Sequence, residues 1–378
     1  MAQITGQRSS MRPVEVRVPE QTDPLRVVVV GPGAVGSFLG GMLAAAGHEV
    51  ALLGRRIPEG VDRSRLIIEE PAGARVVPVR RIVDPADAGA PELVLLAVKM
   101  FDLETALDTA VRWPEAPLMT VQNGAGAEEA ARARRTSPLL AGSLTTAVEP
   151  ATGGVRRLRM GGMGIAAVPG AGAPAAAALA QHLAHGWTAA GLPTRVYGNA
   201  AEMKWSKVLA NLVGNATSAI LDMDPGAIYA DRLGYHVERT QIREMVAVMN
   251  AMGLKPVALP GAHVSALLAG LALPEPIGRQ IVARAVAGAR GGKRPSLRLH
   301  VRGGGPASDA PPGSGPTEAR WLNGAVADAG MRVGVPAPCN AALARLVDDC
   351  ASDPERAAFF AGRPDRLAQA IAAPALGS

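Results

Sequence analysis

Three polar side chains recur at a spacing of four residues near the middle of the chain: Lys207, Asn211 and Asn215. Positions i, i+4 and i+8 lie on one stripe of an α-helix, and the residues between them are largely apolar. Asparagine is a poor helix former, so two in one helix interior call for a reason. An ammonium and two amides in a row would face a carboxylate or a carbonyl in a cleft. A solvent-exposed stripe and a structural polar network between helices are the alternatives.

A second candidate site is the segment Gly31-Pro32-Gly33-Ala34-Val35-Gly36, which fits the pattern G-x-G-x-x-G. In a strand–turn–helix context, the first glycine allows a tight turn, the second the approach of a pyrophosphate, and the third close packing of helix on strand. The helix N-terminus then offers free N–H groups to the phosphates. We therefore predict cofactor contacts at Gly31, Gly33, Ala34, Val35 and Gly36. A turn that is glycine-rich by chance, in a chain with 44 glycines, is the alternative.

The residues that distinguish NAD from NADP are expected about 20 residues after this turn, at the end of the next strand. That strand ends in Leu53-Gly54-Arg55-Arg56, with two guanidinium groups where an NAD site would carry an acid. Guanidinium groups suit a 2′-phosphate, which favours NADP(H), with Arg55 as the contact. Lys99 and Asn123 each follow a later strand, and we predict that they also contact the cofactor. Alternatively, Lys99 is an ordinary surface lysine and Asn123 is a turn residue before Gly124.

The elements that must position these groups alternate between strands and helices in the first half of the chain. Strand patterns are predicted at residues 26–30, 49–53, 75–79, 93–98, 118–122 and 194–197, and helices at 34–46, 103–112 and 127–135. Such alternation predicts a doubly wound, mostly parallel sheet with helices on both faces. With the glycine motif after the first strand, it indicates an α/β Rossmann domain over residues 25–198.

The second half is helical in pattern, which predicts an all-α C-terminal domain over residues 199–378, and the stripe at Lys207 makes this domain the candidate for binding a substrate. Helices are expected at 199–222, 236–253, 261–270, 275–290 and 317–331. Residues 303–316 are rich in Gly and Pro, which is typical of a flexible insertion. Residues 1–24 are interpreted as a flexible N-terminal tail.

Composition narrows the class of protein. Net charge is +6, but the arginines are scattered and not interleaved with aromatics, so we expect no nucleic acid partner. Residues 27–47 carry no charge, yet their six glycines and one proline favour a strand, turn and buried helix over a membrane span. Two unpaired cysteines and the absence of a signal pattern favour the cytoplasm. The histidines show no ligand spacing, so we expect no metal.

These motifs together resemble the ketopantoate reductase family. The glycine turn, Lys99, Gln122-Asn123-Gly124 and the Lys207 stripe occur in that family's order and at about its spacing. The segment Thr317-Glu318-Ala319-Arg320-Trp321-Leu322-Asn323-Gly324, followed by Gly334-Val335-Pro336-Ala337-Pro338, is similar to its C-terminal signature. The resemblance covers about residues 25–350.

The resemblance implies an NADPH-dependent oxidoreductase that reduces 2-dehydropantoate (ketopantoate) to pantoate, as in pantothenate biosynthesis. It implies that Lys207 is the general acid and that Glu318 positions this lysine and the substrate. It further implies that Asn211, Asn215 and Ser296 bind the 2-oxo acid. As hydride reaches the ketone carbon, a lysine can stabilise the charge on the oxygen and donate a proton. Lys204 competes for that role, and spacing to the asparagines favours Lys207.

The chain also departs from the family pattern. His300 stands four positions after Ser296, where the family usually has an acid, and Arg298 and Arg302 flank it. The segment Asp222-Met223-Asp224-Pro225 is a further departure. These differences leave open a different ketone or 2-oxo acid as substrate. A protein that senses NADPH without turnover is a further alternative, and the sequence leaves a homodimer open.

Overall fold

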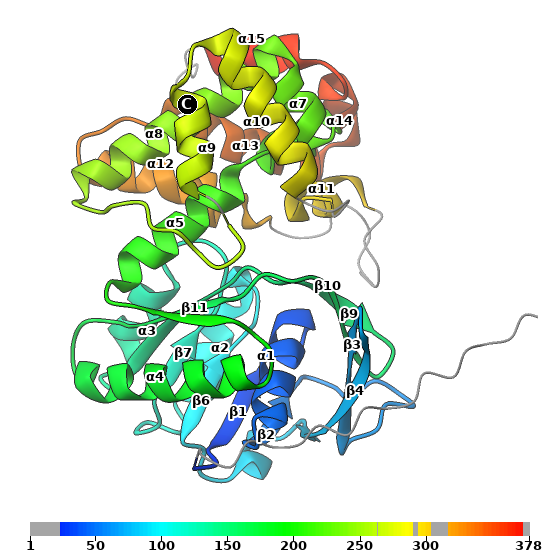
Figure 1. Cartoon of the computed structure of the whole chain (residues 1–378), viewed down its shortest axis with the longest axis vertical. Coiled ribbons are helices and arrows are strands. Elements are labelled where there is room, and N and C mark those ends of the chain that lie inside the picture. Colours follow the sequence, from blue (N-terminus) through cyan, green and yellow to red (C-terminus); the bar gives the residue numbers. More distant parts are fainter. Residues whose placement is uncertain (1–22, 263, 290–293, 304–316, 373–378) are drawn as a thin grey trace, which may run out of the picture.

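The computed structural model describes residues 23–262, 264–289, 294–303 and 317–372. Figure 1 shows an α/β layer below and a group of helices above, with α5 (Ala200–Leu212) running between them. The predicted fold class is confirmed, because a mostly parallel sheet is followed by a mostly helical region. The predicted tail and the predicted insertion lie outside the described residues, apart from residues 23, 24 and 303.

The main sheet has eight strands in the order β12-β11-β8-β7-β6-β1-β2-β5. All neighbours pair in parallel except β8 and β11. The strands are β1 (Arg26–Val30), β2 (Glu49–Leu53), β5 (Arg80–Ile82), β6 (Leu93–Leu96), β7 (Leu118–Thr120), β8 (Leu139–Leu144), β11 (Met163–Ala167) and β12 (Thr194–Tyr197). Because β1, β2, β6 and β7 are parallel, their carboxyl ends meet at one edge, where open α/β sheets bind ligands.

A second sheet was not predicted. It has the order β4-β3-β10-β9 and consists of β3 (Arg65–Glu70), β4 (Gly73–Pro78), β9 (Ala147–Ala151) and β10 (Gly154–Arg159). The predicted strand at 75–79 falls on β4, so its placement in the parallel sheet was wrong. β4 pairs antiparallel with β3, because the turn that joins them is too short for a parallel crossover.

Helix α1 (Ala34–Ala45) explains the uncharged stretch at residues 27–47. It packs between the two sheets, and its residues from Gly36 to Ala45 are all buried. A Cβ on Gly40 would lie 3.0 Å from Leu52 in the main sheet, and one on Gly41 would lie 2.7 Å from Leu66 in the second. A helix covered on two faces needs apolar, small residues all round. Within the described residues, no helix is long and apolar enough to cross a membrane.

The α/β part is completed by elements that cover the main sheet or connect its strands. They are η1 (Pro85–Ala88), η2 (Met100–Asp102), α2 (Leu103–Ala110), α3 (Ala127–Arg134) and α4 (Ala173–Ala189). In Figure 1, α4 lies across the sheet near β11, and α3 packs against β8.

The helical region contains α5 and a series of further helices. These are α6 (Ala216–Leu221), α7 (Pro225–Ala230), α8 (Arg232–Ala251), α9 (Val264–Ala272), α10 (Glu275–Ala289), α11 (Ser296–Arg302), η3 (Glu318–Trp321), α12 (Asn323–Arg332), α13 (Pro338–Ser352), α14 (Pro354–Phe360) and α15 (Pro364–Ala372). Two predicted single helices were wrong: 199–222 is broken into α5 and α6, and 317–331 into η3 and α12.

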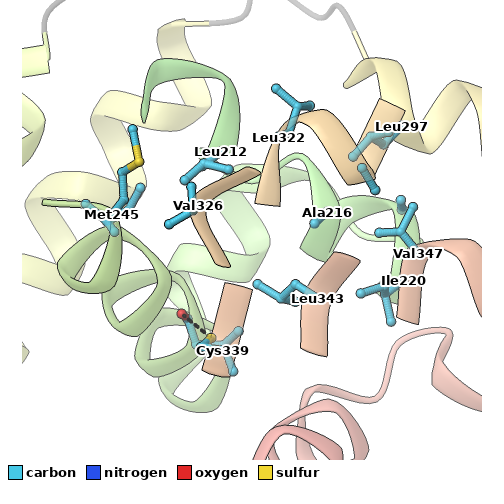
Figure 2. Packing of buried hydrophobic residues seen from close by; sticks show 14 of the residues in the cluster. Leu212, Ala216, Ile220, Met245, Leu297, Leu322, Val326, Cys339, Leu343 and Val347 are labelled. Carbon is cyan, nitrogen blue, oxygen red and sulfur yellow. Dashed lines mark hydrogen bonds between the residues drawn. The ribbon is translucent and has the colours of Figure 1, made fainter. Parts of the chain in front are cut away.

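A continuous apolar core holds these helices together. Figure 2 shows Leu212, Ala216, Val326 and Leu343 converging from α5, α6, α12 and α13. The buried Leu297 on α11 and Leu322 after η3 join the same core. The short elements α11 and η3 are therefore anchored by packing, which fixes the polar residues that they carry.

Candidate functional site

The glycine turn has the geometry that its sequence predicted. Gly31 has φ +91°, a conformation that L side chains rarely adopt. A Cβ on Gly36 would lie 2.3 Å from the carbonyl oxygen of Gly31, so the helix can approach the turn only because this residue is a glycine. A Cβ on Gly33 would meet no atom of the described residues within 4 Å, which leaves the backbone open to a ligand.

A large cavity begins at this turn. Its volume is about 1130 Å³, and Gly31, Gly33, Ala34 and Val35 form part of its wall. Helix α1 starts at Ala34, so its first free N–H groups and the positive end of its dipole lie beside the cavity. This arrangement suits an elongated ligand with phosphate groups near its middle, such as a dinucleotide.

One end of the cavity lies beyond β2. Arg55 and Arg56 follow this strand, have exposed side chains and form part of the wall. Ile57, Pro58 and Val83 add apolar surface there. Guanidinium groups beside an apolar surface suit a phosphate next to an aromatic base.

The second sheet also contributes to the wall, which the sequence analysis missed. Val148, Pro150, Gly153 and Gly154 line the cavity from β9, β10 and the turn between them. This hairpin had a sequence signal, because two consecutive glycines between short strand patterns are typical of a tight turn. Gly153 indeed has φ +72°.

The middle of the cavity lies at the carboxyl edge of the main sheet. Lys99 follows β6, Asn123 follows β7, and both line the wall as expected. Gln122, not singled out as a site residue, also lines it, with its Nε2 donating to the carbonyl oxygens of Leu96 at 2.9 Å and Val98 at 3.3 Å. These bonds fix the start of the loop that carries Asn123.

The far end of the cavity is formed by the helical region. Glu318 on η3 and Ser296 on α11 line it. Glu318 is largely buried, and its Oε2 lies 2.6 Å from Nζ of Lys99. The resemblance paired Glu318 with Lys207, whereas the structure places Lys99 on this carboxylate. This ion pair joins the sheet edge to the helical region.

Lys207 and Asn211 lie on α5, but they are not among the described residues that form the cavity wall. Asn211 reaches the wall indirectly, because its Nδ2 donates to Oδ1 of Asn123 at 3.3 Å. Lys207 is half-buried and lies one helical turn before Asn211. The structure therefore brings α5 to the edge of the cavity.

The predicted stripe of three residues on one helix was wrong for Asn215. Helix α5 ends at Leu212, Gly214 has φ +58°, and Asn215 is the N-cap residue of α6, which begins at Ala216. The N–H of Gly214 donates to the buried carboxyl group of Glu238 at 3.0 Å, which satisfies the backbone where the helix breaks. Asn215 is buried, and its Oδ1 accepts from the N–H of Leu297 at 3.2 Å. Asn215 thus holds the first turn of α11, next to Ser296.

The residues that depart from the family pattern have structural partners. Arg298 on α11 lies 2.9 Å from Oδ1 of Asp222 and 2.5 Å from Oδ1 of Asp224. Arg302 donates to the carbonyl oxygens of Ala219 and Ile220 at 3.0 and 2.6 Å. These two arginines fasten α11 to the end of α6. Together they help to hold Ser296 at the cavity.

Lys204, the competitor for the acid role, is not among the described residues that form the cavity wall. Its ammonium is buried and lies 3.1 Å from Oε1 of Glu128. It also donates to the carbonyl oxygen of Gln122 at 2.7 Å. A lysine enclosed in this way is poorly placed to meet a substrate.

Comparison with known proteins agrees with this geometry. The family model described as "Ketopantoate reductase PanE/ApbA" matches residues 27–170, and the model of the C-terminal part of the same family matches residues 199–351. A 2-dehydropantoate 2-reductase from Halobacterium salinarum is 33% identical over 237 residues, which are 61% of this chain and 77% of that protein. The chain belongs to the ketopantoate reductase family.

Other ketopantoate reductases support the same assignment. A 2-dehydropantoate 2-reductase from Pyrococcus horikoshii is 32% identical over 213 residues, which are 54% of this chain and 66% of that protein. The crystal structure of a PanE/ApbA family ketopantoate reductase from Ralstonia eutropha has a TM-score of 0.67 and 26% identity, and covers 87% of this chain and 99% of its own. As a member of this family, the chain is an oxidoreductase of the kind that uses a pyridine nucleotide.

Proposed function

We propose that this chain reduces a 2-oxo acid with NADPH, and that the acid is 2-dehydropantoate, which becomes pantoate. One observation carries the proposal: a single cavity extends from the glycine turn and Arg55 to Ser296 and Glu318. Cofactor-type and substrate-type groups therefore line one space, in a chain of the ketopantoate reductase family.

Residues 25–198 bind the cofactor in this proposal. The turn at Gly31 and Gly33, with the N–H groups of Ala34 and Val35, holds the pyrophosphate, and Gly36, which was predicted as a contact but is not among the described residues that line the cavity, allows the helix to pack against the turn. Arg55 binds the 2′-phosphate, which accounts for a preference for NADPH over NADH. Lys99 and Asn123 hold the middle and the nicotinamide end of the dinucleotide, because both line the cavity beyond the turn.

Residues 199–378 bind and activate the 2-oxo acid. When bound, the reduced dinucleotide supplies the hydride for the ketone carbon. Lys207 neutralises the charge that develops on the ketone oxygen and delivers the proton that completes the hydroxyl group. In this proposal the long, flexible side chain of Lys207 extends from α5 to the bound substrate, beside Asn211, which donates to Asn123 at the cavity wall.

The remaining polar groups orient the substrate. Ser296 binds the carboxylate at the N-terminus of α11, and Asn211 binds from the side of α5. Asn215 acts mainly through the Leu297 N–H that it holds. Glu318 keeps the ammonium of Lys99 at the cavity edge, so that the far wall carries a fixed charge pair.

A second candidate substrate is a different 2-oxo acid or ketone. The observation that favours it is the set of charged and polar residues on α11. His300 lies about one turn after Ser296, and Arg298 forms ion pairs with Asp222 and Asp224. The family usually has an acid at the position of His300. A changed α11 would alter the part of the site that meets the substrate side chain.

The test measures the oxidation of NADPH and of NADH in the presence of 2-dehydropantoate and of a panel of 2-oxo acids with different side chains. The reaction is monitored by the loss of nicotinamide absorbance. We expect the highest kcat/KM for 2-dehydropantoate with NADPH. A higher kcat/KM for another acid would favour the second candidate. NADPH binding without turnover on any acid would overturn the proposal in favour of a nucleotide-sensing protein.

A further inference from the structure

The ammonium of Lys204 connects the helical region to the α/β part at a buried point. Lys204 belongs to α5, and its side chain is 5% exposed. Its three contacts are Oε1 of Glu128 at 3.1 Å and the carbonyl oxygens of Gln122 at 2.7 Å and Gly142 at 3.4 Å. Three acceptors match the three N–H groups of an ammonium.

The partner carboxylate is itself fixed. Glu128 lies in the first turn of α3, and its Oε1 accepts a hydrogen bond from the hydroxyl group of Thr120 at 2.7 Å. Thr120 is fully buried on β7. The lysine therefore binds groups on α3, on the loop after β7 and on β8, all of which belong to the α/β part.

A buried ion pair is weak evidence for stability, because apolar residues of similar volume often stabilise a fold as well or better. The positions of the contacts suggest a different use. Lys204 holds the carbonyl group of Gln122, while Asn211, seven residues later on α5, donates to the side chain of Asn123. Positions seven apart share one face of a helix, so one face of α5 holds two consecutive residues of the loop after β7.

We propose that Lys204 is a positioning residue, which sets Lys207 and Asn211 on α5 in register with Asn123 at the cavity wall. This inference rests on the proposed function, because it assigns Lys207 to the substrate. The ammonium of Lys204 does not take part in proton transfer. It fixes where α5 meets the sheet edge, and a shift of about 1 Å in a reacting group can lower a rate about 100-fold.

The test compares Lys204→Met with the double variant Lys204→Met/Glu128→Leu. The single variant leaves a buried carboxylate without its cation, so we expect it to lower the unfolding temperature. The double variant removes both charges and should recover much of that loss. Thr120 keeps a partner in the double variant, because its hydroxyl group also lies 3.3 Å from the carbonyl oxygen of Leu140.

A matched control is Arg135→Met. Arg135 is also a buried cation that donates to main-chain carbonyl groups, those of Ala110, Trp113, Pro114 and Ala116. None of these described contacts involves α5 or the loop after β7. We expect this control to lower the unfolding temperature while leaving kcat and the KM for the 2-oxo acid near the wild-type values.

Two readouts separate positioning from stability. We expect kcat to fall about 10- to 100-fold in both Lys204 variants, with the Kd for NADPH nearly unchanged and the fall of kcat at high pH, where the proton donor is deprotonated, retained. We also expect faster amide exchange at residues 121–126, where the N–H of Ala125 donates to the carbonyl oxygen of Trp321 at 3.1 Å. Amide exchange requires no substrate, so it remains decisive if the proposed reaction is wrong.

Two results would overturn the inference. One is a double variant that recovers stability together with wild-type kcat and wild-type exchange at residues 121–126, because Lys204 would then be only structural. The other is loss of the high-pH fall of kcat in Lys204→Met, because Lys204 itself would then be the proton donor.

Discussion

We predict that Gly124→Ala weakens the contact between the loop after β7 and η3, and that activity falls with it. Gly124 has φ +94°. A Cβ at this position would lie 2.5 Å from the carbonyl oxygen of Trp321 and 2.9 Å from its Cβ. The same carbonyl group accepts the N–H of Ala125 at 3.1 Å. Because η3 also carries Glu318, displacing it moves one wall of the cavity.

The size of the effect follows from three contributions. The positive φ costs an alanine about 1–2 kcal/mol. Forcing η3 away from the loop adds about 1–3 kcal/mol of overpacking. Losing the hydrogen bond from Ala125 adds about 1 kcal/mol. Gly126→Ala is the matched control, because Gly126 has φ +106° and its added Cβ would meet no atom of the described residues within 4 Å.

The control should therefore show only the backbone cost. In urea denaturation we expect Gly124→Ala to have the lower midpoint. Its free energy of unfolding should be about 2–4 kcal/mol below that of Gly126→Ala. We also expect kcat/KM for the 2-oxo acid to fall at least about 10-fold more in Gly124→Ala. Equal unfolding midpoints and equal kcat/KM in the two variants would refute the reasoning.

Three further predictions concern the two ends of the cavity and the core. Arg298→Met frees α11 from Asp222 and should raise the KM for the 2-oxo acid about fivefold with little change in kcat; an unchanged KM in steady-state assays would argue against this role. Arg55→Ser should raise the Kd for NADPH about 10- to 100-fold in fluorescence titrations and leave that for NADH unchanged, whereas equal effects on both would reject the 2′-phosphate contact. Burial, assisted by the charge of His182, lowers the pKa of His48 to about 4 from 6.5. The unfolded chain therefore takes up a proton first as pH falls, so stability should be complete above about pH 6.5 and drop by about 3 kcal/mol towards pH 4. His48→Asn, which can keep the acceptor for the N–H of Leu25, should flatten this part of the urea-midpoint profile, and an unchanged slope would assign it to other groups.

The sequence predicted the parts of the site that depend on local rules. The turn at Gly31 and the helix after it need only a glycine pattern between a strand and a helix, and the structure has both. Lys99 and Asn123 were expected at the sheet edge because each follows a strand, and both line the cavity. The roles of these residues stay predictions.

The parts that the sequence did not predict depend on contacts between distant residues. The helix over 199–222 breaks at Gly214 because Glu238, 24 residues later, accepts its N–H. The second sheet requires β10 to pair with β3, about 90 residues earlier in the chain. In the sequence, the arginines on α11 differ from the family pattern without a visible reason. The fold shows that Arg298 forms ion pairs with Asp222 and Asp224. Periodicity and spacing carry no information about such pairings.

The most direct test of the central claim is a single-turnover measurement of hydride transfer in wild-type protein and in Lys207→Ala, with NADPH and 2-dehydropantoate. If Lys207 is the proton donor, the variant binds NADPH with nearly the wild-type Kd and transfers hydride about 100- to 10,000-fold more slowly. Transfer within a few-fold of the wild-type rate would contradict the assignment of Lys207 as the proton donor.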